Sequence, residues 1–164
     1  MCGLDYPGGP VVDRLSKLGK DTYNLPMPLD DDSYNFSFSG IKSAVINVIH
    51  NEIQRGNEIR VNDMCCSFQE RVVSVLVKKT MRAIDEYQVK NLVLAGGVAA
   101  NSYLRERLKE ECDRNNINFG YPRMQYCTDN AAMIGASAYY AYLKGKIGDL
   151  TLNAVAVDTL YNEE

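Results

Sequence analysis

The short segment from Asn91 to Leu94, apolar in three of its four residues, constrains the fold of this chain most strongly. It lies between two stretches whose apolar residues recur at helical spacing, one ending at Tyr87 and one over residues 99–114. A short apolar strand between helices is typical of a parallel sheet that helices cover. A second short strand is predicted over residues 117–121. We therefore expect an α/β protein with a short sheet flanked by helices.

Local signals predict the elements before this segment. A proline in the first turn and a following glycine predict a helix over residues 10–18. Residues 21–33, rich in proline and aspartate, are expected to form a surface loop. Strict alternation of aromatic and polar residues predicts a half-buried strand over residues 34–39. Helical spacing then predicts a helix over residues 41–56.

Two further helix ends carry recognisable caps. Asn62 or Asp63 is the predicted N-cap of the long helix that ends at Tyr87. A last helix, rich in small residues, is predicted from Ala131 to Gly145. From residue 34 onward the predicted order is β-α-α-β-α-β-α.

Size and composition indicate one soluble globular domain. The chain has 164 residues, and 46% are apolar and 24% charged. The longest nearly apolar stretch, residues 131–143, is shorter than the roughly 20 residues that a membrane-spanning helix needs. The first residues lack the pattern of a secretory signal. We expect a cytoplasmic protein without a membrane segment.

The charge balance gives little sign of a surface that binds nucleic acid by itself. The formal net charge is −3, whereas such surfaces are usually basic. Most of the local basic residues are expected on solvated helix faces. These are Lys17, Lys20, Lys78, Lys79, Arg105 and Arg107. A nucleic-acid substrate would therefore need a second surface.

Cysteine and histidine usage excludes several kinds of site. The five cysteines contain no C-x-x-C pair, and their odd number does not indicate a disulfide framework or a zinc ribbon. We expect reduced and mostly buried thiols. The single histidine, His50, falls opposite the apolar stripe of its helix and is expected to be exposed.

Three loop-to-helix junctions share a design that suits polar ligands. They are residues 6–13, 94–101 and 126–131, and each places glycines or a short polar residue just before a helix. Helix N-termini offer unpaired amides and partial positive charge, and glycine lets a ligand approach the backbone. The Gly96-Gly97 junction also follows a strand, where ligands of open α/β sheets gather. One such junction alone is most often a plain connector, and no P-loop motif is present.

Four ordered motifs resemble one family. They are GLDYPGGPVVD, FSFSGIKSA, LAGGVAANSYLRERL and YCTDNAAMIGA, which begin at Gly3, Phe36, Leu94 and Tyr126. They are similar to the successive signatures of the tRNA adenosine threonylcarbamoyltransferase family, formerly called O-sialoglycoprotein endopeptidases or glycoproteases. The strand-Gly-Gly-x-Ala-helix pattern also resembles the adenosine-contacting element of the actin, Hsp70 and sugar-kinase superfamily.

The resemblance implies a fold and a place within a larger protein. It implies an actin-like, ribonuclease-H-like ATPase lobe, with residues 1–164 forming the C-terminal lobe of a two-lobed enzyme. The N-terminal lobe, with an H-x-x-x-H metal motif and the first phosphate loop, has no counterpart here. Because Met1 stands just before the first motif, an expressed fragment or a truncated reading frame is expected.

The resemblance also implies an activity. The family transfers a threonylcarbamoyl group from threonylcarbamoyl-adenylate to the N-6 amine of the adenosine beside the anticodon, in tRNAs that read ANN codons. The implied partners are that adenylate, tRNA, the missing lobe and accessory subunits of the tRNA-modification complex. Without its other lobe the fragment is expected to be inactive and to bind no cofactor tightly.

Site residues follow by matching motifs. Gly9 and Asp13 are implied to contact the hydroxyls of the ligand, and Asn101 to bind a polar group beside the nucleotide, with Gly96 and Gly97 as possible backbone contacts. Asp129 is implied to ligate a divalent metal, iron or zinc, in the complete enzyme. No catalytic residue is assigned, and Ser37, Ser39 and Lys42 receive no role.

Each of these residues also has a purely structural interpretation. Gly9 could only turn the chain, Asp13 could be an exposed helix residue, Asn101 could be a surface residue of a first turn, and Asp129 could be an N-cap. Three other functions also stay open. They are a nucleotide-binding lobe of a sugar-kinase-like protein, a non-catalytic interaction module and, least favoured, a metallo-glycopeptidase.

Overall fold

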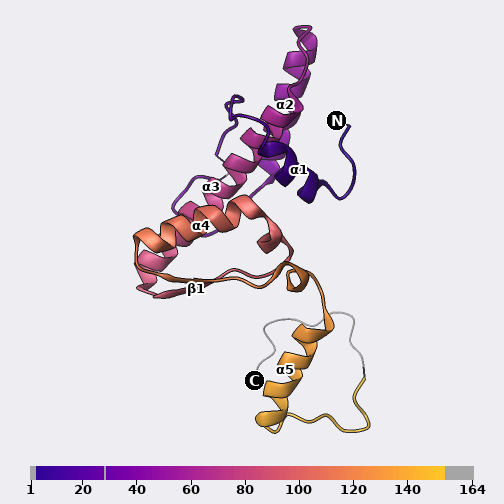
Figure 1. The fold of residues 1–164 in the computed structure, drawn as a ribbon, viewed down its shortest axis with the longest axis vertical. Helices are drawn as coiled ribbons and strands as arrows, with labels where there is room; N and C mark the ends of the chain where they lie inside the picture. The colour runs from indigo at the N-terminus through magenta and orange to yellow at the C-terminus, as the bar shows by residue number, and fades with distance from the viewer. Residues whose placement is uncertain (1–2, 28, 154–164) are drawn as a thin grey trace. The chain divides into compact units, whose positions relative to one another are not determined.

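The computed structural model describes residues 3–27 and 29–153 (Figure 1). The chain divides into two compact units, one ending at Cys127 and the other beginning at Thr128. The described part of the first unit contains both strands and four α-helices, and the described part of the second contains one helix.

A two-stranded parallel sheet lies against two helices of the first unit. Strands β1 (Asn91–Val93) and β2 (Asn118–Gly120) pair in parallel, with Leu92 opposite Phe119. Helices α3 (Val61–Tyr87) and α4 (Ser102–Arg114) pack against this pair. The buried centre consists of Val73, Val77, Leu104 and Leu108. The predicted α/β class with a short sheet and packed helices is confirmed.

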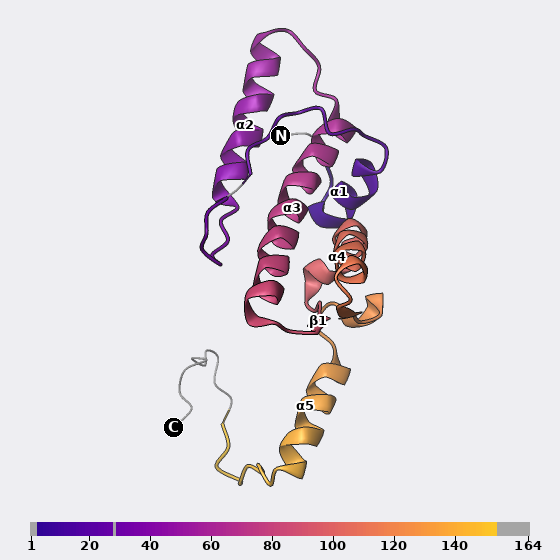
Figure 2. The ribbon, with the colours of Figure 1, turned by 90° about the vertical axis from the view of Figure 1, so that its left-hand side faces the viewer.

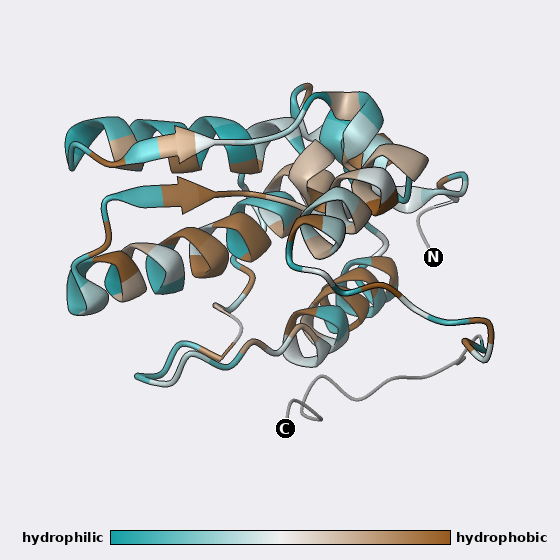
Figure 3. Cartoon of the chain, turned by 90° about the horizontal axis from the view of Figure 1, so that it is seen from below, coloured by the Kyte–Doolittle hydropathy of each residue, from teal (hydrophilic) through white to brown (hydrophobic). Residues whose placement is uncertain are grey.

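Helices α1 (Gly8–Ser16) and α2 (Ser39–Gln54) both lie beside α3 (Figure 2). Helix α1 packs directly on α3. Helix α2 joins α3 through a second apolar cluster centred on Leu25, Ile49 and Met64. Apolar residues recur along the helices, and Figure 3 shows them as brown bands between teal ones. Helix α3 is therefore the element around which the unit is built.

The predicted strand over residues 34–39 is wrong. Residues 35–38 have no regular structure, and α2 already begins at Ser39. Cations of α3 bond to carbonyl groups of this segment and of the residue before it. Lys79 Nζ donates to the Asn35 carbonyl at 2.6 Å, and Arg82 donates to the Ser33 carbonyl at 2.8 Å. The alternation still has a consequence, since the rings of Phe36 and Phe38 stack with centroids 6.3 Å apart.

Several basic residues are not on solvated faces, which corrects that expectation. Lys79 is only 2% exposed and donates to Asp31 at 2.9 Å. Arg105 and Arg107 are half-buried and bonded to neighbouring residues. The segment over residues 30–35 supplies anions and carbonyls to α3, so it is a strap bound to the helix rather than a free loop.

This strap should make stability depend on acid pH. Hydrogen bonds from Lys79 and then Ser33 lower the pKa of Asp31 to about 2, from an ordinary value of 3.8. Because the folded pKa is depressed, the stabilisation is complete above about pH 4 and is lost as the pH falls toward 2. Asp31→Asn should therefore flatten the decline of the urea midpoint over that window. An unchanged decline in the variant would contradict the assignment.

The predictions for the cap of α3, for His50 and for the cysteines agree only in part with the structure. Helix α3 begins at Val61 without a side-chain cap, so the predicted Asn62 or Asp63 cap is wrong. Asp63 instead accepts from the Lys20 amide at 2.9 Å.

His50 is exposed as predicted. Three cysteines are buried, Cys65, Cys112 and Cys127, while Cys66 is half-buried and Cys2 lies outside the described residues. Burial raises the pKa of the Cys66 and Cys112 thiols.

The described part of the second unit contains helix α5 (Ala131–Leu143). Its N-cap is Asn130, whose side chain accepts from the Met133 amide at 3.1 Å. The predicted helix is confirmed to within two residues, and no residue of it is buried. Within the described ranges, no helix has the length and apolar character that a membrane crossing requires.

Candidate functional site

A cavity of about 320 Å³ in the first unit brings two of the three predicted junctions together. Gly8 and Gly9 line it from the start of α1, and Val98 and Asn101 from the turn before α4. Helix α3 supplies the floor with Phe68, Gln69, Val72, Val73 and Leu76. The walls are mainly apolar, so the glycine backbone and two amide side chains are the polar features of this cavity.

The start of α1 presents bare backbone to this cavity. Apart from its chain neighbours and the backbone of its own helix, no heavy atom lies within 4 Å of the position that a Cβ would take at Gly8 or Gly9, and both residues are exposed. Amides of a first helical turn have no acceptor inside the helix, and Pro7 at the N-cap provides no side-chain acceptor. These amides can therefore donate to a polar or anionic ligand.

Asn101 has a structural role and still faces the cavity. Its Oδ1 accepts from the Leu104 amide at 2.8 Å, which caps α4, and its Nδ2 donates to Gln69 Oε1 at 2.8 Å. An asparagine amide has two N–H groups and two acceptor lone pairs. One hydrogen and one lone pair therefore remain for a ligand. The structural interpretation expected a surface residue of a first turn, whereas Asn101 is the N-cap of α4.

Asp13 lies next to the cavity without lining it. Both of its carboxylate oxygens accept from Ser102 Oγ at 3.0 Å, and Lys17 Nζ lies 3.7 Å from one of them. The Asp13 side chain is 19% exposed. Because Ser102 follows Asn101 directly, this bond joins α1 to the N-terminus of α4. Asp13 is thus a partly buried acceptor rather than an exposed helix residue.

Gly96 and Gly97 form the turn that leads from β1 to α4. Gly96 has φ +89°, a backbone conformation that favours glycine, and Gly97 opens a short 3₁₀ helix, η1 (Gly97–Ala100). Arg105 fixes this turn by donating to the carbonyl of Ala99 and, at 3.3 Å, to that of Pro122. Both glycines are exposed, but Val98 is the residue of the turn that reaches the cavity.

A larger groove of about 760 Å³ adjoins this cavity. Phe68, Val72, Leu76, Val98 and Leu104 line both spaces. The groove continues along α2 through Phe38, Ile41 and Val45, and it reaches Leu94 and Ala95 before the glycine turn. Lys42 stands at this groove, whereas Ser37 and Ser39 bond to each other through their hydroxyls at 3.0 Å.

Asp129 belongs to the second unit, where it immediately precedes the cap of α5. The structural interpretation of Asp129 as the N-cap is wrong, because Asn130 holds that position. The Asp129 side chain is exposed. In residues 3–27 and 29–153, no three side chains of histidine, cysteine, aspartate or glutamate gather as a metal site requires. These residues therefore do not fit a metal centre by themselves.

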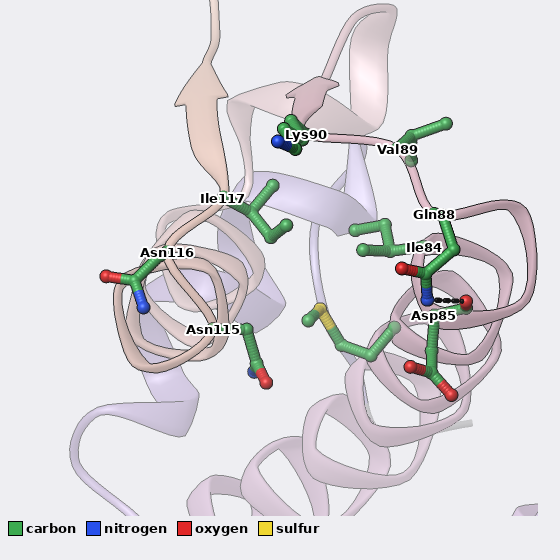
Figure 4. A pocket seen from close by; sticks show the side chains of 9 residues that line it. Ile84, Asp85, Gln88, Val89, Lys90, Asn115, Asn116 and Ile117 are labelled. Atoms are coloured by element: carbon green, nitrogen blue, oxygen red, sulfur yellow. Dashed lines mark hydrogen bonds between the residues drawn. The ribbon is translucent and has the colours of Figure 1, made fainter.

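A separate pocket of about 400 Å³ lies at the amino-terminal end of the strands, between the end of α3 and the turn that follows α4 (Figure 4). It is lined by Ile84, Asp85, Gln88, Lys90, Asn115 and Asn116, among others. Gln88 and Asn115 bond to backbone carbonyls of their own helices. In α/β sheets the carboxyl end of the strands is the usual ligand side, and the predicted residues of the first unit lie at that end.

Sequence reasoning missed three polar residues that organise the site. Gln69 and Ser102 contact the predicted residues, and Glu70 holds α3 to α4 beside them. Burial raises the pKa of Glu70, but hydrogen bonds from Tyr103, Ser74 and Arg107 outweigh it and leave the pKa below its usual value. Gln69 and Glu70 are polar residues of α3, and helical periodicity alone assigns polar residues to the solvent side of a helix.

Comparison with known proteins agrees with the motifs. A family model described as tRNA N6-adenosine threonylcarbamoyltransferase matches residues 1–136. Proteins of that name from Bacillus cereus (strain ATCC 14579) and Staphylococcus aureus (strain JH9) are 55% and 51% identical to the chain over 153 and 152 residues. The matches cover 92% of this chain but 45% of each relative, so the chain spans less than half the length of these relatives. The chain belongs to the tRNA N6-adenosine threonylcarbamoyltransferase family.

Proposed function

We propose that this chain supplies one ligand-binding wall of an enzyme that transfers a threonylcarbamoyl group to the N-6 amine of adenosine in tRNA. The donor is threonylcarbamoyl-adenylate, and the acceptor is the adenosine beside the anticodon in tRNAs that read ANN codons. The observation that carries the proposal is the shared cavity of Gly9 and Asn101, two residues that family motifs mark and that lie 92 positions apart in the chain.

The residues of this cavity fit an adenylate. Free amides at Gly8 and Gly9 suit phosphate oxygens or hydroxyls, and the spare amide hydrogen of Asn101 suits a polar group beside them. The adjoining apolar groove suits the faces of a purine ring. Asp13, a carboxylate with acceptor capacity left after its bond to Ser102, suits paired ribose hydroxyls.

The metal and the remaining partners require more than this chain. Asp129 would contribute one carboxylate ligand to an iron or zinc ion whose other ligands lie outside the chain. The described residues do not form such a centre by themselves. We further propose an actin-like lobe architecture, a cytoplasmic location, and contacts of the complete enzyme with tRNA and accessory subunits.

Titration with ATP tests this function. The chain alone and the chain mixed with the preceding part of the Bacillus cereus relative would be compared by calorimetry, and the mixture would then be assayed for threonylcarbamoyl transfer to tRNA. We expect transfer and clear ATP binding only in the mixture, because half a cleft lacks much of the positioning. ATP binding without transfer would favour a kinase-like lobe, and neither in a folded mixture would favour an interaction module.

A further inference from the structure

We infer that Gln69 is a positioning residue that sets the distance and orientation between the Gly8-Gly9 turn and Asn101. Its side chain links α1, the helix that begins at this turn, to Asn101 through consecutive hydrogen bonds. Asn101 Nδ2 donates to Gln69 Oε1 at 2.8 Å, and Gln69 Nε2 donates to Ser16 Oγ at 2.8 Å. Ser16 Oγ in turn donates to the Asp13 carbonyl at 3.1 Å.

The bridge is buried, and its direction is fixed. Gln69 is 5% exposed and Ser16 is 6% exposed, so neither can exchange its partner freely for water. The Leu104 amide must bond to an oxygen, which orients the Asn101 amide and leaves its Nδ2 pointing to Gln69. Gln69 therefore presents Oε1 to Asn101 and keeps Nε2 for Ser16. One amide side chain with a donor and an acceptor is required at this position.

The position of Gln69 in the fold explains why it controls the site. It lies on α3, and it lines both the cavity of Gly9 and a smaller one beside Ser102. Toward α1 it holds the last turn through Ser16, and toward α4 it holds the capping residue Asn101. Loss of the bridge would leave the bond between Asp13 and Ser102 to hold α1 to the start of α4, while the apolar core, centred on other residues, stays packed.

A ligand-free experiment tests the bridge itself. In ¹⁵N-labelled chain, Gln69→Met should shift the backbone amide resonances of Gly8 and Gly9 and the side-chain amide resonances of Asn101. The control Gln54→Met replaces an exposed glutamine at the end of α2 and should leave them in place. Unchanged resonances in a folded Gln69→Met chain would overturn the inference.

A second variant keeps the test valid if Gln69→Met does not fold. Gln69→Glu preserves the size of the side chain, and the ionised carboxylate still accepts from Asn101 but draws the Ser16 hydroxyl hydrogen away from the Asp13 carbonyl. When the carboxyl is protonated it can donate to Ser16 again. The Gly8 and Gly9 resonances should therefore follow the titration of the introduced carboxyl. Gly8 and Gly9 resonances that do not change during this titration would contradict the bridge.

The functional consequence rests on the proposed function and is measured separately. In the mixture that binds ATP, Gln69→Met should weaken ATP affinity about tenfold, the effect of one lost hydrogen bond of average strength or slightly more. Gln54→Met should match the unmodified chain. If the unmodified mixture binds no ATP, the proposed function fails and the resonance test still judges the bridge. If it binds and Gln69→Met binds equally well, the positioning role alone is wrong.

Discussion

Replacing Gly19 by alanine is expected to destabilise the first unit by about 3 kcal/mol. Gly19 follows α1 and lies directly on the backbone at the start of α3. An added Cβ would overlap the carbonyl group of Asn62 and would lie 2.7 Å from the backbone nitrogen of Asp63. Backbone atoms in a helical turn cannot move aside as a flexible side chain can. The free energy of unfolding, from urea denaturation followed by circular dichroism, measures the effect.

The matched control is the same substitution at Gly40. This glycine lies in the first turn of α2, and no heavy atom lies within 4 Å of its Cβ position. Alanine has a higher helix propensity than glycine, so Gly40→Ala should leave stability unchanged or raise it by up to about 1 kcal/mol. Equal midpoints for the two variants would show that the contact at Gly19 does not restrict the fold.

Gly19 also shows what sequence reasoning can and cannot supply. Its place after a helical pattern predicted a helix end at residue 18, and α1 ends two residues earlier, at Ser16, with Lys17 as its C-cap. Nothing local indicated that the absence of a side chain is required by a segment more than 40 positions away. The long helices and both sheet strands were predictable for the opposite reason, since their apolar spacing is a local property.

The segment over residues 34–39 failed for a related reason. Alternation describes which side chains share a side, and Phe36 and Phe38 do stack. It does not say which groups will satisfy the backbone. Here Lys79 of α3 bonds to the Asn35 carbonyl, which a strand would have paired, and Arg82 bonds to the Ser33 carbonyl just before the segment. A strand prediction needs a partner strand, and sequence periodicity cannot identify one.

In the candidate site too, some residues could be predicted from local sequence and others could not. Gly9 and Asn101 could be predicted because each belongs to a helix start with a recognisable motif, and the fold brings both to one cavity. Gln69 could not, because a glutamine within a helical pattern is ordinarily assigned to the solvent side. Only the packing of α1 and α4 on α3 shows that this amide is buried between two ligand-facing junctions.

Asp13→Ala should lower threonylcarbamoyl transfer by about 10- to 100-fold in kcat/KM, measured in the mixture of the chain and the complementary part of a relative. Hydrogen bonds to a charged group contribute about 1.5–3 kcal/mol, which corresponds to that range. In the proposed site the carboxylate accepts from the ligand hydroxyls as well as from Ser102. Its removal therefore deprives the ligand of an acceptor and also loosens α1 from the N-terminus of α4.

The control for Asp13 is Asp113→Ala on α4. Both aspartates pair with a lysine four positions away in or next to the same helix, Lys17 at 3.7 Å and Lys109 at 2.7 Å. Both variants therefore lose one ion pair of small energy to an exposed lysine. Asp113 lies near the far end of α4, away from the capping residue Asn101. The Asp113→Ala substitution should therefore leave kcat/KM unchanged. Equal rates for the two variants, with both proteins folded, would mean that the Asp13 carboxylate only stabilises its helix and that the ligand hydroxyls are bound elsewhere.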